Sequence, residues 1–267
     1  MPESFTTEGI YGEFAEVPGG SGRPTLLLIH GGFLGAWCWE HWLRELPGLG
    51  WSAAALSARN HPGSFAVDNE TYRTRTTLAD YLADVTAAAR YMETRTGQRC
   101  IPVGHSMGGI LAQCFAAQET QRGEPVPAMV LLCGVPPAPL GPLRKRPAGT
   151  HAAFLPVRTP TWPGNDPVLN AVFPRMVAES PNVMNAYSLG AGVPVERDAI
   201  RCRTLVVSAE RDNTIVPKDD RIARHYAAGP GGADYWLAEG MGHLVMLEPG
   251  WERVLRQVVD WLNRTAR

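Results

Sequence analysis

A serine between glycines is the feature of this sequence best suited to covalent chemistry. Ser106 stands in the segment GHSMG, residues 104–108, which follows the apolar run Cys100–Val103 and precedes a helix-compatible run. At a strand-to-helix junction, small flanking residues permit a sharp, strained turn in which larger side chains would clash with backbone. Such a turn presents the Ser106 hydroxyl above the sheet and directs the N–H group of Met107 toward a nearby anion. We therefore expect a nucleophile at Ser106 and an oxyanion donor at Met107.

A serine hydroxyl is a weak nucleophile until a base removes its proton, so Ser106 requires a histidine partner. His243 has the most suitable setting, because it ends the loop Gly240–His243 directly after the last predicted strand, at the carboxyl edge of a sheet. The other six histidines lie in helical patterns (His41 and His225), in loops (His61 and His151), inside the serine turn (His105) and in a glycine motif (His30). His243 is the predicted general base.

The base needs a carboxylate that orients its imidazole and stabilises its charged form. Asp212 follows the apolar run Thr204–Val207 and therefore belongs to the same sheet edge as the other two groups. Two other acids compete with it: Glu210 is closer to the end of the strand, and Asp219 is expected in the helix that follows. We favour Asp212 because the Ile-Val-Pro segment after it would anchor its loop.

An alternation of strands and helices must bring these three groups together. Four short, continuously apolar runs are typical of strands buried on both faces of a parallel sheet, and two weaker runs resemble them. The strong runs are Thr25–Ile29, Arg99–Val103, Met129–Cys133 and Thr204–Val207, and the weaker ones are Trp51–Leu56 and Asp234–Ala238. Helical stripes run from Leu78 to Met92, between a capping box at Thr77 and a stop at Gly97, and from Trp251 to Leu262. The pattern predicts an α/β fold, with a mostly parallel central sheet flanked by helices on both faces.

The alternation is interrupted after Cys133. Residues 134–200 are rich in proline and carry only short helical patterns, at Val168–Ala178 and Asn182–Leu189. A connection of this length more often forms a lid or a binding element than an idle loop, and proline-rich surface packing is the alternative. We expect a core domain of residues 1–133 and 201–267 with an inserted, mainly helical lid at 134–200.

Composition excludes several classes of function. The chain has 267 residues, of which 45% are hydrophobic, so one sizeable core is expected, and its net charge of -1 argues against a nucleic-acid partner. The first residues show no secretory signal, and no apolar stretch is long enough to cross a bilayer. The five cysteines are scattered and lack metal-type spacing, so we expect buried free thiols, no metal site and a cytoplasmic protein.

Four motifs together resemble the α/β-hydrolase fold superfamily over nearly the whole chain. They are HGG (30–32), GHSMG (104–108), ERDNTIVP (210–217) and GMGHLVMLEP (240–249), in the order and with the spacing of that superfamily. The resemblance implies that Ser106 is the nucleophile, that His243 acts as base and then as acid, and that Asp212 orients His243. It also implies that the residue after His-Gly, here Gly32, gives the second oxyanion N–H, with Phe33 as the alternative. His30 is expected to hold the loop.

The resemblance implies hydrolysis of a carboxylic ester, lactone or thioester through an acyl-enzyme, with no cofactor. The start HGGFLGAWCWEHW is also similar to small plant-type methylesterases and hydroxynitrile lyases. A thioesterase, a lyase or carbon-carbon hydrolase with the same triad, and a small-molecule receptor with little turnover stay open as alternatives. The expected partner is a small to medium, largely apolar ester-like molecule, and the protein is expected to be a monomer or homodimer. The candidate substrate contacts are Phe33, Leu34, Trp37, Phe154, Trp162, Phe173, Met176, Met184 and Tyr187.

Overall fold

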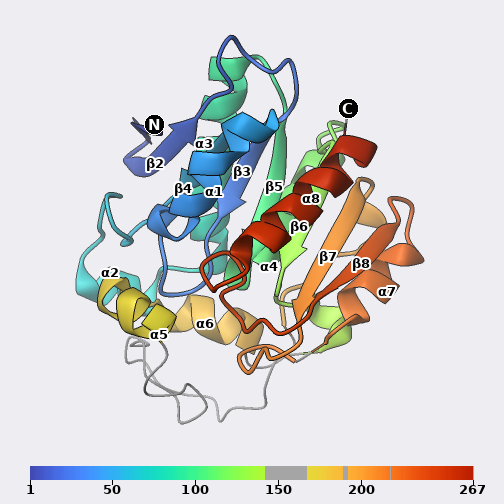
Figure 1. Ribbon diagram of the computed structural model, residues 1–267. Coiled ribbons are helices and arrows are strands. Elements are labelled where there is room, and N and C mark those ends of the chain that lie inside the picture. The colour runs from blue at the N-terminus through green and yellow to red at the C-terminus, as the bar shows by residue number, and fades with distance from the viewer. Residues whose placement is uncertain (142–166, 189–191, 217, 267) are drawn as a thin grey trace.

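In the computed structural model, one central sheet lies between two layers of helices (Figure 1). The structure describes residues 1–141, 167–188, 192–216 and 218–266. The strands are β1 (Glu3–Thr7), β2 (Ile10–Ala15), β3 (Thr25–Ile29), β4 (Ala53–Leu56), β5 (Cys100–His105), β6 (Ala128–Leu132), β7 (Arg203–Ala209) and β8 (Ala233–Ala238). They lie in the order β1-β2-β4-β3-β5-β6-β7-β8, and every pairing from β4 to β8 is parallel. The predicted fold class is confirmed.

All six predicted strands are present, and an N-terminal hairpin adds two that the sequence did not predict. Strands β1 and β2 pair antiparallel, and β2 joins the parallel part of the sheet by pairing antiparallel with β4. The hairpin turns at Glu8 and Gly9, whose φ angles of 49° and 79° are both positive, as in the tight turns that fit the twist of two strands. At the sheet edge only one face of β1 is covered, so it lacks the continuous apolar run that marks a central strand.

Helices fill the connections between the strands. They are α1 (Glu40–Glu45), α2 (Asn69–Thr74), α3 (Leu78–Thr96), α4 (Met107–Gln121), α5 (Pro167–Val172), α6 (Pro181–Ser188), α7 (Arg221–Ala227) and α8 (Trp251–Thr265). The predicted limits of α3 are confirmed, since Asp80 accepts the N–H of Thr77 at 2.8 Å and Gly97 ends the helix with a φ of 67°. Among the described helices, none is both long enough and apolar enough to span a membrane.

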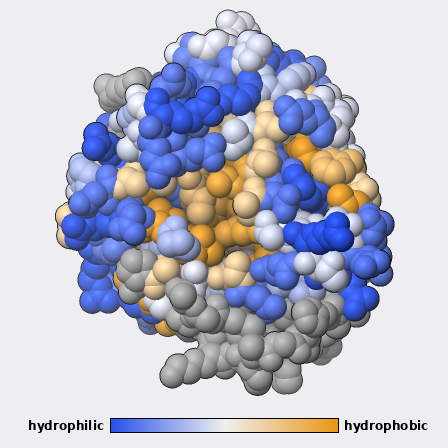
Figure 2. Space-filling view, turned by 180° about the vertical axis from the view of Figure 1, so that it is seen from behind, coloured by the Kyte–Doolittle hydropathy of each residue, from blue (hydrophilic) through white to orange (hydrophobic). Residues whose placement is uncertain are grey.

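The sheet carries a separate apolar core on each face. Side chains alternate along β3, so Leu27 and Ile29 belong to the core that includes side chains of α3 and α4, whereas Leu26 and Leu28 belong to the opposite core, which includes side chains of α1 and α8. Figure 2 shows the molecule from the side of α3 and α4, where apolar residues gather across the middle of the face and polar residues surround them. Strands β3, β4, β5 and β6 are buried along their whole length between these two layers, and the loops that carry the candidate site begin at the carboxyl ends of the strands.

The described helices of the connection from β6 to β7 lie at the carboxyl edge of the sheet (Figure 1). Helices α5 and α6 lie along that edge together with α2 (Figure 1). The predicted helix at Val168–Ala178 is shorter than expected: α5 ends at Val172, a 3-10 turn covers Phe173–Arg175, and the chain is then extended up to α6. Pro174 explains the break, because it removes a helical donor and clashes with the preceding turn. The boundaries of a lid at 134 and 200 stay a prediction.

Candidate active site

Ser106 occupies the sharp turn that its flanking glycines predict. It lies between β5 and α4, with φ 52° and ψ -117°, a conformation that is strained for any residue with a side chain. The turn is crowded: a Cβ on Gly104 would lie 2.2 Å from the Gly108 carbonyl oxygen, and one on Gly108 would lie 2.2 Å from the Ile29 carbonyl oxygen. Glycine is therefore required at both flanks. Met107 is the first residue of α4, where N–H groups have no partner within the helix.

The loop after β3 passes directly over this turn. A Cβ on Gly31 would lie 3.0 Å from the Cβ of Ser106 and 2.7 Å from Nδ1 of His105. Of the two alternatives for the second oxyanion donor, the Phe33 N–H is engaged, because it donates to Oε1 of Glu179 at 2.9 Å. This geometry favours Gly32, the other alternative. His30 holds the loop as expected: its Nε2 accepts the N–H of Ala58 at 3.1 Å.

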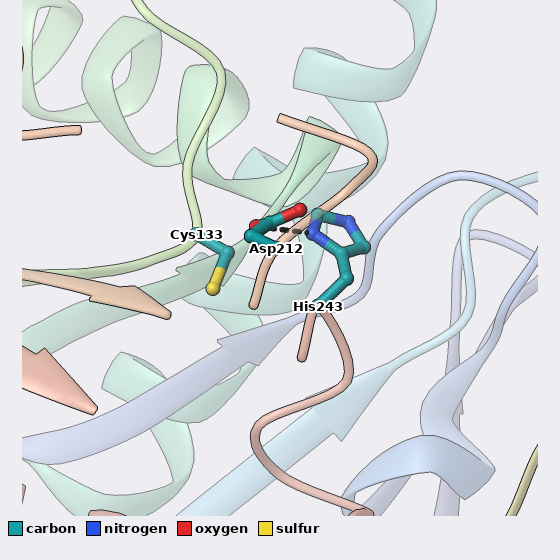
Figure 3. A group of neighbouring side chains, drawn as sticks. All are labelled: Cys133, Asp212 and His243. Carbon is teal, nitrogen blue, oxygen red and sulfur yellow. Dashed lines mark hydrogen bonds and ion pairs between the residues drawn. The ribbon is translucent and has the colours of Figure 1, made fainter. Parts of the chain in front are cut away.

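His243 and Asp212 are paired at the same edge of the sheet. Nδ1 of His243 lies 2.8 Å from Oδ2 of Asp212. The dashed line in Figure 3 marks this interaction. The other carboxylate oxygen accepts the N–H groups of Thr214 and Ile215 at 2.8 and 2.9 Å. Burial would raise the pKa of Asp212, but the neighbouring His243 and these hydrogen bonds outweigh burial and lower the pKa to about 2. Asp212 is therefore an ionised acceptor with a fixed orientation.

The two competing acids are bonded elsewhere. Glu210 accepts the N–H of Gly240 at 2.8 Å and pairs with Lys218 at 3.0 Å, on the exposed side of the loop. Asp219 pairs with Arg221 at 2.7 Å. The expectation that Asp219 belongs to the next helix is wrong, because α7 begins only at Arg221. The structure therefore brings Asp212, and neither competitor, to the imidazole.

His105 joins the serine turn to the His243 loop. Its Nε2 lies 2.9 Å from the carbonyl oxygen of His243, and the centroids of the two imidazole rings are 4.7 Å apart. The hydrogen bonds of the described residues include none between Ser106 Oγ and His243. Hydrogen bonds of this kind are often long in ligand-free enzymes and shorten when substrate binds. The serine, the imidazole and the carboxylate thus lie in neighbouring loops at one sheet edge.

The sequence model of the alpha/beta hydrolase family matches residues 26–257. The chain belongs to this family. Among solved structures, it is similar to a bromoperoxidase from Bacillus anthracis (TM-score 0.71, 16% identity, 98% of this chain and 100% of that chain covered). It is also similar to a thermophilic esterase from Thermogutta terrifontis (TM-score 0.67, 20% identity, 100% of both chains covered). A third similar structure is Est1E from Butyrivibrio proteoclasticus with ferulic acid bound (TM-score 0.68, 16% identity, 98% of both chains covered). No curated protein sequence matches this chain.

Cys133 is an unexpected neighbour of the acid in this alpha/beta hydrolase. It follows β6, and its Sγ lies within 4.8 Å of the ligand atoms of Asp212 and His243 (Figure 3). Three such groups can in principle hold a metal ion, but the donor chemistry is poor here. Burial, together with the charge of Asp212, raises the pKa of the thiol, and only a thiolate is a good ligand. The group fits a hydrogen-bonded carboxylate beside a protonated thiol better than it fits a metal centre.

The candidate substrate contacts lie in different surroundings. A Cβ on Gly32 would lie 3.4 Å from Oη of Tyr187 and 3.8 Å from Sδ of Met184, so α6 covers the oxyanion loop. Leu34 and Trp37 are buried in the core beneath α1 and α8, and Met176 and Phe173 are half-buried. Phe33 is also half-buried, and the last two, Phe154 and Trp162, lie outside the described residues. Contact of these side chains with a substrate stays a prediction.

Sequence reasoning missed a buried ion pair next to the oxyanion loop. Nε2 of His61 lies 2.9 Å from Oε1 of Glu179, and both side chains are fully buried. His61 was expected only as a loop histidine, and Glu179 lies in the predicted lid. A single acid in the apolar stretch before Pro181 was the only signal that the sequence offered.

Proposed function

We propose that this alpha/beta hydrolase cleaves a carboxylic ester, lactone or thioester through an acyl-enzyme formed at Ser106. The proposal rests on one arrangement: a serine on a strained strand-to-helix turn, beside a histidine whose Nδ1 is hydrogen-bonded at 2.8 Å to a buried carboxylate. This combination supplies a nucleophile, a base and the group that orients the base.

The mechanism follows from the protonation of His243. Ionised Asp212 only accepts hydrogen bonds, so Nδ1 of His243 carries the proton and Nε2 has a free lone pair. Nε2 takes the proton of Ser106 as Oγ attacks the carbonyl carbon, and the N–H groups of Met107 and Gly32 stabilise the oxyanion. The imidazolium then protonates the leaving group, and Nε2 activates the water that hydrolyses the acyl-enzyme.

The surroundings of the oxyanion loop support a small to medium, largely apolar substrate. Met184 and Tyr187 of α6 lie against Gly32, so the acyl group would meet a thioether and an aromatic ring there. The structural likeness to an esterase agrees with ester cleavage, but at 20% identity it supports only the fold. The same proposal includes contact of the predicted side chains with the substrate, a reaction that needs no cofactor, and a cytoplasmic location.

A pre-steady-state assay tests the proposed function. Wild type is mixed with p-nitrophenyl esters of increasing acyl length, and the acyl adduct is then located by intact and peptide mass. We expect a burst of p-nitrophenol equal to the enzyme concentration and an adduct on Ser106. The variant Ser106→Ala should keep its circular-dichroism spectrum and lose both, because the hydroxyl contributes little to packing. A folded wild type with neither adduct nor turnover would refute ester hydrolysis and favour a lyase or receptor.

A further inference from the structure

The segment before α6 holds both backbone groups of Phe33. The N–H of Phe33 donates to Oε1 of Glu179 at 2.9 Å, and its carbonyl accepts the N–H of Val177 at 3.0 Å. We call these two hydrogen bonds the clamp. Phe33 directly follows Gly32, the donor that the proposed function assigns to the oxyanion, so the clamp acts one residue away from the reacting atoms.

Phe33 has a conformation that requires such support. Its φ is 69°, a region in which a residue with a side chain is strained. The N–H of Leu34 donates to the carbonyl of Gly31 at 3.3 Å, so these residues form a turn with Phe33 in the third position, where a positive φ normally calls for glycine. Phenylalanine can hold this conformation only if other contacts stabilise the turn, and the clamp supplies two such contacts.

The carboxylate of Glu179 is held from every side. Its Oε2 accepts the hydroxyl of Tyr81 at 2.8 Å, and Tyr81 is in turn 2.8 Å from the hydroxyl of Tyr72. Its Oε1 accepts from both His61 and Phe33, each at 2.9 Å. Because Glu179 is fully buried, these bonds are not exchanged for water, and the carboxylate keeps one position.

The hydrogen bonds of His61 require it to be charged. Its Nε2 faces the Glu179 carboxylate, and its Nδ1 faces the carbonyl oxygen of Arg59 at 2.9 Å. Both partners only accept, so both ring nitrogens must carry a proton. Burial lowers the pKa of His61, but the charge and the bond of Glu179 outweigh burial and raise it.

Charge balance explains why the acid and the histidine occur together. Oε1 of Glu179 would lie 3.8 Å from a Cβ placed on Gly32, and an isolated negative charge there would oppose the oxyanion. The imidazolium of His61 cancels that charge at 2.9 Å. The pair therefore gives the Phe33 N–H a strong acceptor and adds no net negative charge that would destabilise the oxyanion of the transition state.

From these contacts we infer that Glu179 is a positioning residue of the reaction. Neutralised by His61, it fixes the Phe33 turn and thereby keeps the N–H of Gly32 aimed at the oxyanion. The inference rests on the proposed function for its kinetic consequence, whereas the clamp itself is a property of the ligand-free protein. The clamp ties the oxyanion loop to the connection that carries α6.

Three variants separate positioning from stability. Glu179→Ala removes the acceptor, Glu179→Gln keeps an oxygen for the Phe33 N–H, and Ser180→Ala is the matched control. Ser180 is the next residue and is equally buried, but its hydroxyl donates to the carbonyl of Thr76 at 2.8 Å rather than to the oxyanion loop. For each protein, kcat and KM are measured with a p-nitrophenyl ester well below its Tm. Hydrogen exchange of the Phe33 amide is measured by NMR without substrate.

We expect Glu179→Ala to lower kcat by about tenfold or more with a change in KM of about threefold or less, because the oxyanion contact forms only in the transition state. Exchange of the Phe33 amide should accelerate in the same variant. Glu179→Gln should lie closer to wild type in both readouts, and Ser180→Ala should lower Tm with kcat and exchange unchanged. Equal kcat losses in Glu179→Ala and Ser180→Ala, or an unchanged Phe33 exchange rate, would overturn the inference.

Two further outcomes are also decisive. If Glu179→Ala does not fold, Glu179→Asp replaces it, because the shorter side chain draws the carboxylate back from the Phe33 N–H; kcat and Phe33 exchange equal to those of Ser180→Ala would then overturn the inference. If wild type neither hydrolyses esters nor is labelled at Ser106 by a fluorophosphonate, the proposed function fails. The clamp is then tested by hydrogen exchange alone, and an unchanged exchange rate of the Phe33 amide in Glu179→Ala would refute it.

Discussion

Asp212→Asn replaces one carboxylate oxygen by an amide nitrogen and leaves the volume of the side chain unchanged. In the structure Oδ1 accepts two backbone N–H groups, from Thr214 and Ile215. An amide NH₂ cannot face two donors, so the asparagine oxygen takes the place of Oδ1 and the NH₂ group faces Nδ1 of His243. Nδ1 must then accept a hydrogen bond, and the imidazole proton moves to Nε2. A protonated Nε2 cannot take the proton of Ser106.

The expected loss is large because the wrong tautomer removes the base. In a serine triad this change lowers kcat by about 10⁴-fold, which corresponds to about 5.5 kcal/mol of activation free energy. The fold should persist, since asparagine retains the bonds to the two backbone N–H groups. KM should change little, because Asp212 lies behind His243, on its Nδ1 side.

Initial rates of p-nitrophenyl ester hydrolysis at neutral pH measure the effect, and thermal melting verifies the fold. Glu210→Gln and Asp219→Asn are the controls, because both acids lie in the same region and are bonded to Lys218 and Arg221 instead. Both controls should keep kcat within about threefold of wild type. A kcat of Asp212→Asn within tenfold of wild type, or an equal loss in Glu210→Gln, would refute the assignment of the acid.

Two further predictions concern the strained turn. Ser106→Gly should abolish turnover yet raise the free energy of unfolding by about 1 kcal/mol, because glycine adopts a positive φ without strain. Urea denaturation measures this free energy, and a variant less stable than wild type would contradict the strain argument. Gly104→Ala should destabilise the protein by about 3 kcal/mol, since its Cβ would lie 2.2 Å from the Gly108 carbonyl oxygen. Gly48→Ala is the control in the same denaturation series, because a Cβ there meets nothing within 4 Å, and equal effects of the two substitutions would disprove the packing argument.

Local patterns predicted the central sheet and the groups at its carboxyl edge. Strand β3 was predicted to the residue, because a strand buried on both faces is continuously apolar and ends where its glycine motif begins. The hairpin β1–β2 was missed, because an edge strand has a mixed burial pattern. The limits of α5 were wrong for a different reason: the apolar spacing continues past Pro174, but the helix cannot.

Chain order and spacing determined which serine, acid and histidine are candidates, since loops after neighbouring parallel strands end at one edge of a sheet. Only the tertiary structure shows which acid meets the imidazole and which N–H group of the oxyanion loop is already engaged. Asp212 is distinguished from Glu210 by a hydrogen bond across 31 residues of chain, and Gly32 from Phe33 by a contact that comes from Glu179. The ion pair of His61 and Glu179 joins residues 118 positions apart. Hydrogen bonds between such distant residues leave no periodic trace in a sequence, because they depend on how the elements pack rather than on local spacing.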